Sequence, residues 1–152
     1  MSFEPHNGIT LNSASPTGTA NTAALVMLGL AGSITPQSTG RILVIVSGDM
    51  SQSTTGDGGA IQISMGTGAA PSNGGALAGT QFGSLVTMTF LTGVLTVPFC
   101  IHALPGGQVT PNYTGTGKAQ VTPVPLWVDL AFKAVTGGTF TLSNVTLTAF
   151  EI

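Results

Sequence analysis

The stretch that decides the fold covers residues 39–68 and reads TGRILVIVSGDMSQSTTGDGGAIQISMGTG. Residues 41–46 begin with one arginine and continue as an aliphatic run, which is typical of a strand buried on both faces. A polar segment follows at 47–55, and then the turn signal Gly56-Asp57-Gly58-Gly59. Apolar and polar residues alternate over 60–65, as in a strand with one face in a core. The stretch therefore predicts an antiparallel strand pair at the centre of a β domain.

Similar signals recur along the rest of the chain at short spacing, separated by Gly and Pro. No segment of ten or more residues has a helical pattern. Pro98 predicts a break or bulge in its segment, because proline cannot donate to a strand ladder. These features predict an all-β fold, an antiparallel β-sandwich of the jelly-roll type with about eight strands. Further strands are expected at 23–30, 85–90, 94–103, 126–133 and 139–152.

The last of these strands changes phase along its length. Phe140 and Leu142 share one parity, whereas Val145 and Leu147 share the opposite one. Such a shift predicts a β-bulge at Ser143-Asn144.

The N-terminal part of the chain differs from the remainder in composition. Residues 1–21 are polar and interrupted by Pro and Gly, and we expect an extended arm or a short edge strand there, with a frayed terminus as the alternative. A single jelly-roll domain is expected over 22–152. Within it, 23–30 is apolar throughout, and Gly29, Gly32 and Pro36 favour a strand over two helical turns.

Charge is scarce in this protein. Of 152 residues, 42% are hydrophobic and 5% are charged, against about 25% charged in an average domain. A folded monomer of this mass exposes on the order of 7,000 Å², so each charged side chain serves roughly 900 Å² of surface. Such a surface protects poorly against association. We expect much of it to be covered by further copies or by a larger assembly, with a neutral Thr/Ser/Gly-rich surface as the competing explanation.

The charges that are present exclude some partners. Arg41, Lys118 and Lys133 are scattered, whereas phosphate binding needs clustered cations, so no nucleic acid is expected. No charge run indicates a membrane surface, and the N-terminus lacks the pattern of a signal peptide.

The residues that could carry chemistry do not combine into a reactive site. Cys100 and His102 share a strand face, but no third group accompanies them, and the ordinary expectations are a buried cysteine and a partly buried structural histidine. Asp49 and Asp57 could hold calcium between loops, although the spacing of a known calcium loop is missing. We therefore expect no catalytic residue, no metal and no cofactor.

Other residues are candidates for contact with a partner. Arg41 heads an apolar strand, where it either pairs across an interface or caps the strand in solvent. Trp127 is an interface anchor or a core residue. The long loop at 104–123 is expected to face a partner. The candidate interface residues are Phe3, Ile9, Leu11, Arg41, Tyr113, Trp127 and Phe150.

Two segments resemble a group of tailed-bacteriophage virion proteins. Residues 26–80 carry Gly29-Leu30, Ile34-Thr35-Pro36, Thr39-Gly40-Arg41, Gly56-Asp57-Gly58, Gly66-Thr67-Gly68 and Ala69-Ala70-Pro71. Residues 126–152 end on Thr148-Ala149-Phe150-Glu151. The likeness covers about two thirds of the chain and concerns strands and turns, not a catalytic signature. The segment 104–123 departs from the pattern, being richer in Pro and Gly.

The resemblance implies a compact jelly roll similar in style to trimers of the C1q/tumour-necrosis-factor fold. It implies a capsid decoration (cement) protein with two partners, the major capsid protein and further copies of itself, a trimer being favoured over a dimer. Such a protein is assembled in the host cytoplasm and resides on the capsid surface of the virion. The alternative function is a receptor- or glycan-binding head domain of a tail or head fibre. An enzyme is a third hypothesis that the residue inventory disfavours.

Overall fold

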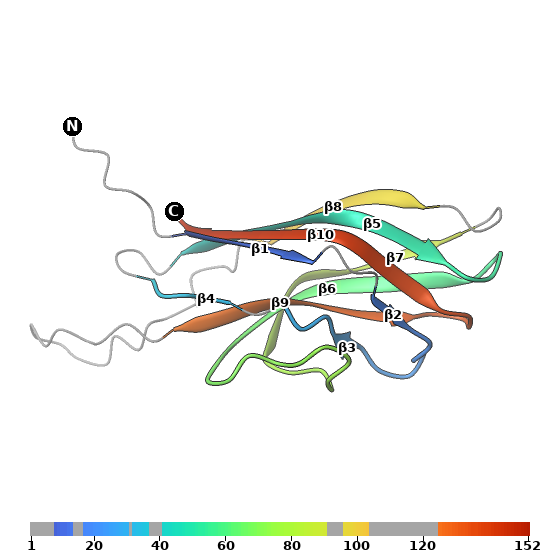
Figure 1. The fold of residues 1–152 in the computed structure, drawn as a ribbon, viewed down its shortest axis with the longest axis horizontal. Helices are drawn as coiled ribbons and strands as arrows, with labels where there is room; N and C mark the ends of the chain where they lie inside the picture. Colours follow the sequence, from blue (N-terminus) through green and yellow to red (C-terminus); the bar gives the residue numbers. More distant parts are fainter. Residues whose placement is uncertain (1–7, 14–16, 31, 37–40, 91–95, 104–124) are drawn as a thin grey trace, which may run out of the picture.

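The computed structural model describes residues 8–13, 17–30, 32–36, 41–90, 96–103 and 125–152. Within these ranges the chain forms ten strands and no helix. The strands make two antiparallel sheets that face each other, as the two layers of Figure 1 show. The all-β sandwich expected from the sequence is confirmed.

Sheet A and sheet B have the same plan. In sheet A the spatial order is β1 (Gly8–Ser13), β10 (Phe140–Glu151), β5 (Ile42–Gln52) and β8 (Val97–Ala103), and β2 (Thr17–Thr19) also pairs with β10. In sheet B the order is β3 (Val26–Met27), β9 (Leu126–Ala134), β6 (Gly58–Thr67) and β7 (Thr80–Thr89), and β4 (Ser33–Ile34) also pairs with β9. Each sheet therefore has one edge formed by two short strands.

The strand order is that of a jelly roll. Strands β1 and β2 lie along β10 as two parts of one interrupted edge strand, and β3 and β4 lie along β9 in the same way. When each pair is counted once, the ten strands become eight. The first strand then lies beside the last in one sheet, and the second lies beside the next-to-last in the other. This is the nested pairing of a double Greek key.

The decisive stretch folds as a strand pair, with two corrections. Strand β5 continues to Gln52, so the polar segment expected from residue 47 is largely strand. The expectation that both faces of 41–46 are buried was wrong, because Val44 is fully buried whereas Ile45 is 36% exposed. Strands β6 and β9 are the ones that are mainly buried on both faces.

Other sequence expectations have mixed outcomes. The bulge at Ser143-Asn144 is confirmed, since the register of β10 against β5 shifts there and Asn144 has a φ of 50°. The break or bulge expected at Pro98 was wrong, because β8 runs through Pro98 and pairs with β5 without a register shift; β8 is an edge strand, where proline is tolerated. The strand expected over 23–30 was wrong for most of its length, because only Val26–Met27 is strand.

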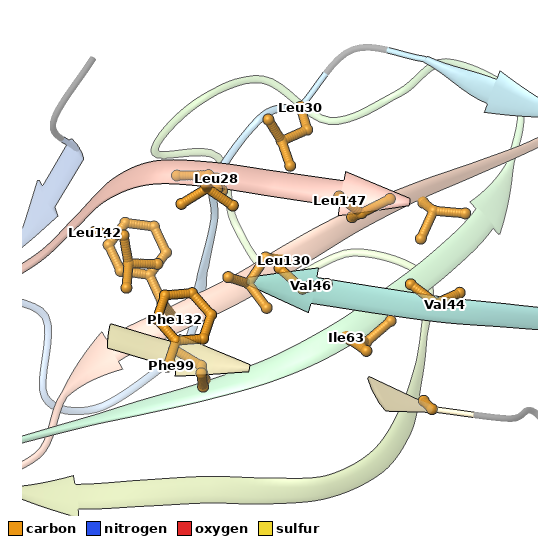
Figure 2. Packing of buried hydrophobic residues seen from close by; sticks show 14 of the residues in the cluster. Leu28, Leu30, Val44, Val46, Ile63, Phe99, Leu130, Phe132, Leu142 and Leu147 are labelled. Atoms are coloured by element: carbon orange, nitrogen blue, oxygen red, sulfur yellow. The ribbon is translucent and has the colours of Figure 1, made fainter. Parts of the chain in front are cut away.

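The core lies between the sheets, and Figure 2 shows part of it. Sheet A contributes Val44 and Val46 from β5, and sheet B contributes Leu130 and Phe132 from β9. The ring of Phe140 lies 6.4 Å from that of Phe132 in a tilted arrangement, within the range of favourable aromatic pairs. Leu28 and Leu30 also reach this core, although they lie in the gap between β3 and β4.

A buried carboxylate holds the gap between β3 and β4. Asp129 Oδ2 accepts the backbone N–H of Gly29 at 2.8 Å, and Oδ1 accepts those of Leu30 at 3.1 Å and Leu130 at 2.8 Å. Asp129 is fully buried, and a buried charge is tolerated only when it is paired or hydrogen-bonded. In the gap, the carboxylate of Asp129 thus accepts backbone N–H groups of Gly29 and Leu30, a role that a strand carbonyl has elsewhere in the sheet.

The connection between β6 and β7, residues 68–79, covers the outer side of sheet B. Met27 donates its N–H to the carbonyl of Gly75 and accepts the N–H of Gly74, both at 2.9 Å. Ser64 on β6 donates its hydroxyl to the carbonyl of Ala78. Trp127, Met27 and Ala131 form a small buried cluster beneath this cover.

The first prediction concerns the pH dependence of stability. Burial raises the pKa of Asp129 to about 6, against the opposing pull of the three backbone N–H groups. Because the pKa of Asp129 is higher in the folded state, its protonated carboxyl stabilises the fold relative to the unfolded chain. This contribution is fully present below a pH of about 3.8 and is lost as the pH rises through about 6. We expect the free energy of unfolding, measured by urea titration, to decrease by roughly 3 kcal/mol over that window.

Asp129→Asn removes the titrating group and is expected to abolish this slope. Asp49→Asn is the matched control, because it leaves the buried carboxylate in place and should keep the wild-type slope. An Asp129→Asn variant with an unchanged slope would contradict the assignment.

The second prediction concerns the contact between β6 and β10. A Cβ at Gly59 would overlap the ring of Phe140, which is fully buried. Overpacking of this kind costs about 1–3 kcal/mol, so Gly59→Ala should lower the thermal midpoint in calorimetry. Gly137→Ala is the control, since its Cβ would come no closer than 3.3 Å to the side chain of Asp57. Equal midpoints for the two variants would refute the close packing.

Candidate interface on the outer face of sheet A

The outer side of sheet A is a surface that no described segment of the chain covers. Side chains alternate between the two faces of a strand, so every second residue of each strand points outward here. We call this set the open face. Its members are Gly8, Thr10 and Asn12 of β1, Thr146, Thr148 and Phe150 of β10, Leu43, Ile45 and Ser47 of β5, and Cys100 and His102 of β8.

The strand register places these residues in rows across the sheet. One row runs Thr10, Thr148, Ile45, His102, and the next runs Asn12, Thr146, Ser47, Cys100. A third joins Gly8, Phe150 and Leu43. The open face is thus a threonine-rich surface with Ile45 in its middle row and Phe150 and Leu43 in the row at one end.

Cross-strand hydrogen bonds orient the polar side chains of the open face. The hydroxyls of Thr10 and Thr148 are 3.4 Å apart, and the Thr146 hydroxyl donates to Asn12 Oδ1 at 2.9 Å. Pairs of this kind stabilise a sheet by about 0.2–1 kcal/mol each. They also fix the positions of the hydroxyl groups that a partner would meet.

Charged residues lie toward the two ends of this surface. Arg41 is exposed, shares the parity of Leu43, and accepts the N–H of Ile152 on its carbonyl at 2.8 Å. At the other end, Asp49 Oδ2 accepts the side-chain N–H of Asn144 at 2.8 Å across the bulge. Between these two residues, the open face as defined above contains no Lys, Arg, Asp or Glu.

The outer side of sheet B, unlike that of sheet A, is covered by other parts of the chain. Its outward residues Ser64 and Ala131 are fully buried, and Trp127 is 4% exposed. The connection at 68–79 and the edge strands of sheet B exclude solvent from these positions. Among the described residues, therefore, one face of the sandwich is covered by the chain itself and the other has no such cover.

The residues proposed as an interface are spread over several places. Phe150 lies on the open face and Arg41 at its end. Ile9 and Leu11 point to the other side of β1, where they pack partly buried against the core. Trp127 is buried within the chain and donates its Nε1–H to the carbonyl of Thr67 at 3.2 Å. Phe3 and Tyr113, like the loop at 104–123, lie outside the described residues.

Sequence reasoning missed the centre of the open face. Ile45 and Thr148 are neighbours across β5 and β10, but neither was singled out. The available signal was the alternation in β10, where Thr146 and Thr148 separate the buried Leu147 and Ala149.

Cys100 and His102 share a face, as expected, but the expectations of a buried cysteine and a partly buried histidine were wrong. Both side chains are exposed. They belong to an edge strand whose outer side has no cover among the described residues. Among the described residues, neither side chain has a hydrogen-bonded partner that would activate it as a nucleophile or a base.

The carboxylates considered for calcium are engaged elsewhere. Asp57 Oδ1 accepts the Thr136 hydroxyl at 2.7 Å, and Asp49 bonds Asn144. Within the described ranges, no group of three or more His, Cys, Asp or Glu side chains is placed to hold a metal ion. The same residues include no helix of the length and apolarity that a membrane span requires.

Comparison with known proteins gives matches of structure. No family profile and no curated protein matches the sequence. The fold is similar to a mutant VP2 protein of infectious bursal disease virus in T=1 particles (TM-score 0.49, 11% identity). It is also similar to structures of the Gt strain of that virus (0.44, 14%) and of its T13 particle (0.46, 12%). The matches cover 97% of this chain but 36–38% of the other chains, so this chain spans little more than a third of their length.

Proposed function

We propose that the protein is a bacteriophage capsid decoration protein that binds the outer capsid surface through the open face and stabilises the head. The observation that carries the proposal is the contrast between the two sides of the sandwich. One side is covered by the chain itself, whereas the other presents four hydrogen-bonded strands without a charged side chain at their centre. The resemblance of the sequence to phage virion proteins supports the same conclusion.

A neutral face of this kind suits contact with a large, repetitive partner. Removing a charge from water is expensive unless it finds a partner, and the centre of the open face avoids that cost. Its threonine hydroxyls can both donate and accept hydrogen bonds, and Ile45 and Phe150 supply apolar area. The surrounding sheet holds these groups in place, so little conformational entropy is lost on binding.

The size of the face indicates how binding becomes strong. Four strands at about 4.8 Å spacing and three rows about 7 Å apart give roughly 400 Å². A stable interface buries about 800 Å² per partner, so one copy alone would bind weakly. A symmetric oligomer that engages several capsid subunits at once gains avidity without new contacts. Hundreds of identical sites on a capsid favour that arrangement.

The third prediction tests this use of the face. Ile45→Lys places a charge at the centre of the row that contains Thr148 and His102. We expect binding to capsids stripped of decoration proteins, measured by co-sedimentation, to fall at least about tenfold, because the lysine must be desolvated in the contact. Circular dichroism should be unchanged, since Ile45 is 36% exposed.

Leu77→Lys is the control, because Leu77 is 40% exposed on the connection that covers sheet B. It should bind as the wild type does. Equal binding by all three proteins would refute the assignment of the face. Gel densitometry of virions distinguishes a decoration protein from the alternative, a receptor- or glycan-binding fibre head. Copy numbers in the tens per virion, together with binding to a glycan array, would indicate the fibre head.

A further inference from the structure

The edge strands β7 and β8 border a groove of about 280 Å³ on one side of the sandwich. Its apolar walls come from Phe82 and Val86 of β7 and Ile101 of β8, and the buried core residue Ile63 of β6 lies among them. This volume is just below the range of about 300–1,000 Å³ that drug-sized ligands occupy. The groove therefore suits one large side chain better than a larger molecule.

The apolar walls result from the way in which β7 pairs with β6. Phe82 lies opposite Ile63 and Val86 lies opposite Ile61, and both isoleucines belong to the core. Directly opposed residues of an antiparallel pair point to the same side of the sheet, so Phe82 and Val86 also face the inside of the sandwich. Val86 is nevertheless 36% exposed. Among the described residues, the inner face of sheet B is thus incompletely covered at β7.

A bulge in β7 holds the walls of the groove in place. Three residues of β7 lie opposite Gln62 alone, and one of them, Gly83, has a φ of 72°. The carbonyl of Gly83 accepts the side-chain N–H of Gln62 at 3.0 Å. A Cβ at Gly83 would lie 3.4 Å from the Cβ of Ala103, so β7 and β8 approach each other closely at this point. A groove whose walls are already fixed loses little conformational entropy when a partner enters it.

The rim of the groove is continuous with the open face. Cys100 and His102 line the groove and also belong to the open face. His102 lies directly across from Ile45 on the neighbouring strand, about 4.8 Å away. Among the described residues that line the groove, none is Lys, Arg, Asp or Glu, and Ser84 and His102 supply polar groups. A Lys, Arg, Asp or Glu side chain of a partner would lose its hydration here without finding an opposite charge.

We propose that the groove is the anchor site of the capsid contact and takes one uncharged aromatic side chain, tyrosine or tryptophan, from the capsid protein. This inference rests on the proposed function and identifies the part of the partner that the protein recognises. Phe82 offers a ring against which an aromatic side chain packs, and Ser84 and His102 offer polar groups to its polar end. Tyrosine and tryptophan combine an apolar body with such an end, and both are enriched among the residues that dominate interfaces.

An aromatic anchor supplies binding energy that the open face lacks. The three rows of the open face measure roughly 400 Å², and a buried aromatic side chain contributes about 150–250 Å² more. The contact then approaches the roughly 800 Å² per partner of a stable interface. A side chain enclosed by a pocket also contributes more than a side chain that lies on a surface. One partner can use the face and the groove together, because they meet at β8.

The fourth prediction tests the anchor with two neighbouring residues of β7. Val86→Lys places a charge in the groove, and we expect it to weaken co-sedimentation with stripped capsids at least about tenfold. Leu85→Lys is the matched control, because Leu85 is 45% exposed but does not line the groove; it should bind as the wild type does. Circular dichroism should be unchanged in both variants. Wild-type binding by Val86→Lys, or equal losses in the two variants, would overturn the anchor.

A second measurement needs no capsid. In nuclear magnetic resonance titrations, p-cresol, the analogue of a tyrosine side chain, should shift the imidazole signals of His102 and the methyl signals of Ile63. Val86→Lys should abolish these shifts, and benzylamine, a cation of similar size, should not cause them. A wild-type protein whose signals do not respond to p-cresol would overturn the proposed chemistry of the groove.

The Ile45→Lys variant keeps the failures of the two proposals apart. Weak capsid binding by Ile45→Lys together with wild-type binding by Val86→Lys would refute the anchor alone. Wild-type binding by both variants would refute the proposed function as well. Losses in both variants, with Leu85→Lys unaffected, support the two proposals together.

Discussion

The three hydrogen bonds that backbone N–H groups donate to Asp129 are the constraint on which the asymmetry of this sandwich depends. Asp129 lies within β9, and its carboxylate accepts backbone N–H groups where β3 has ended and β4 has not begun. Leu28 and Leu30, two residues apart, both reach the core from this segment. The interruption closes the sandwich on that side, and the carboxylate makes the interruption tolerable in a region that water does not reach.

The same constraint places the cover on sheet B. The connection at 68–79 pairs with Met27, the last residue before the interruption. Its residues Ser72 and Asn73 lie so close to Gly29 that no Cβ would fit between them. This long connection covers sheet B, and the described residues include no comparable connection over sheet A. The free face is therefore a consequence of how the β3–β4 gap is held, and not of weaker hydrophobicity in β5.

Much of the fold follows from local patterns, whereas its asymmetry does not. Alternation located β6, β8, β9 and β10, and a parity change located the bulge at Ser143-Asn144, because both depend on which face of one strand meets the core. Burial on the outer face depends instead on contacts far along the chain. Asp129 and Gly29 are 100 residues apart, and nothing in either segment indicates the pairing. For the same reason β5 resembled a strand buried on both faces, and Trp127 could not be assigned to core or surface.

The structure shows where the uncharged surface of this protein carries apolar side chains. A neutral protein can remain soluble when its polar groups are spread evenly, but here exposed apolar side chains interrupt the neutral surface at several places. Ile45 and Phe150 lie on the open face, where the polar side chains are held by cross-strand hydrogen bonds. Leu85 and Val86 lie on strand β7 beside a groove between β7 and β8, and Leu77 and Ile152 are exposed elsewhere. The open face and this groove meet at β8, because Cys100 and His102 belong to both. A partner on the open face would therefore also meet the rim of the groove.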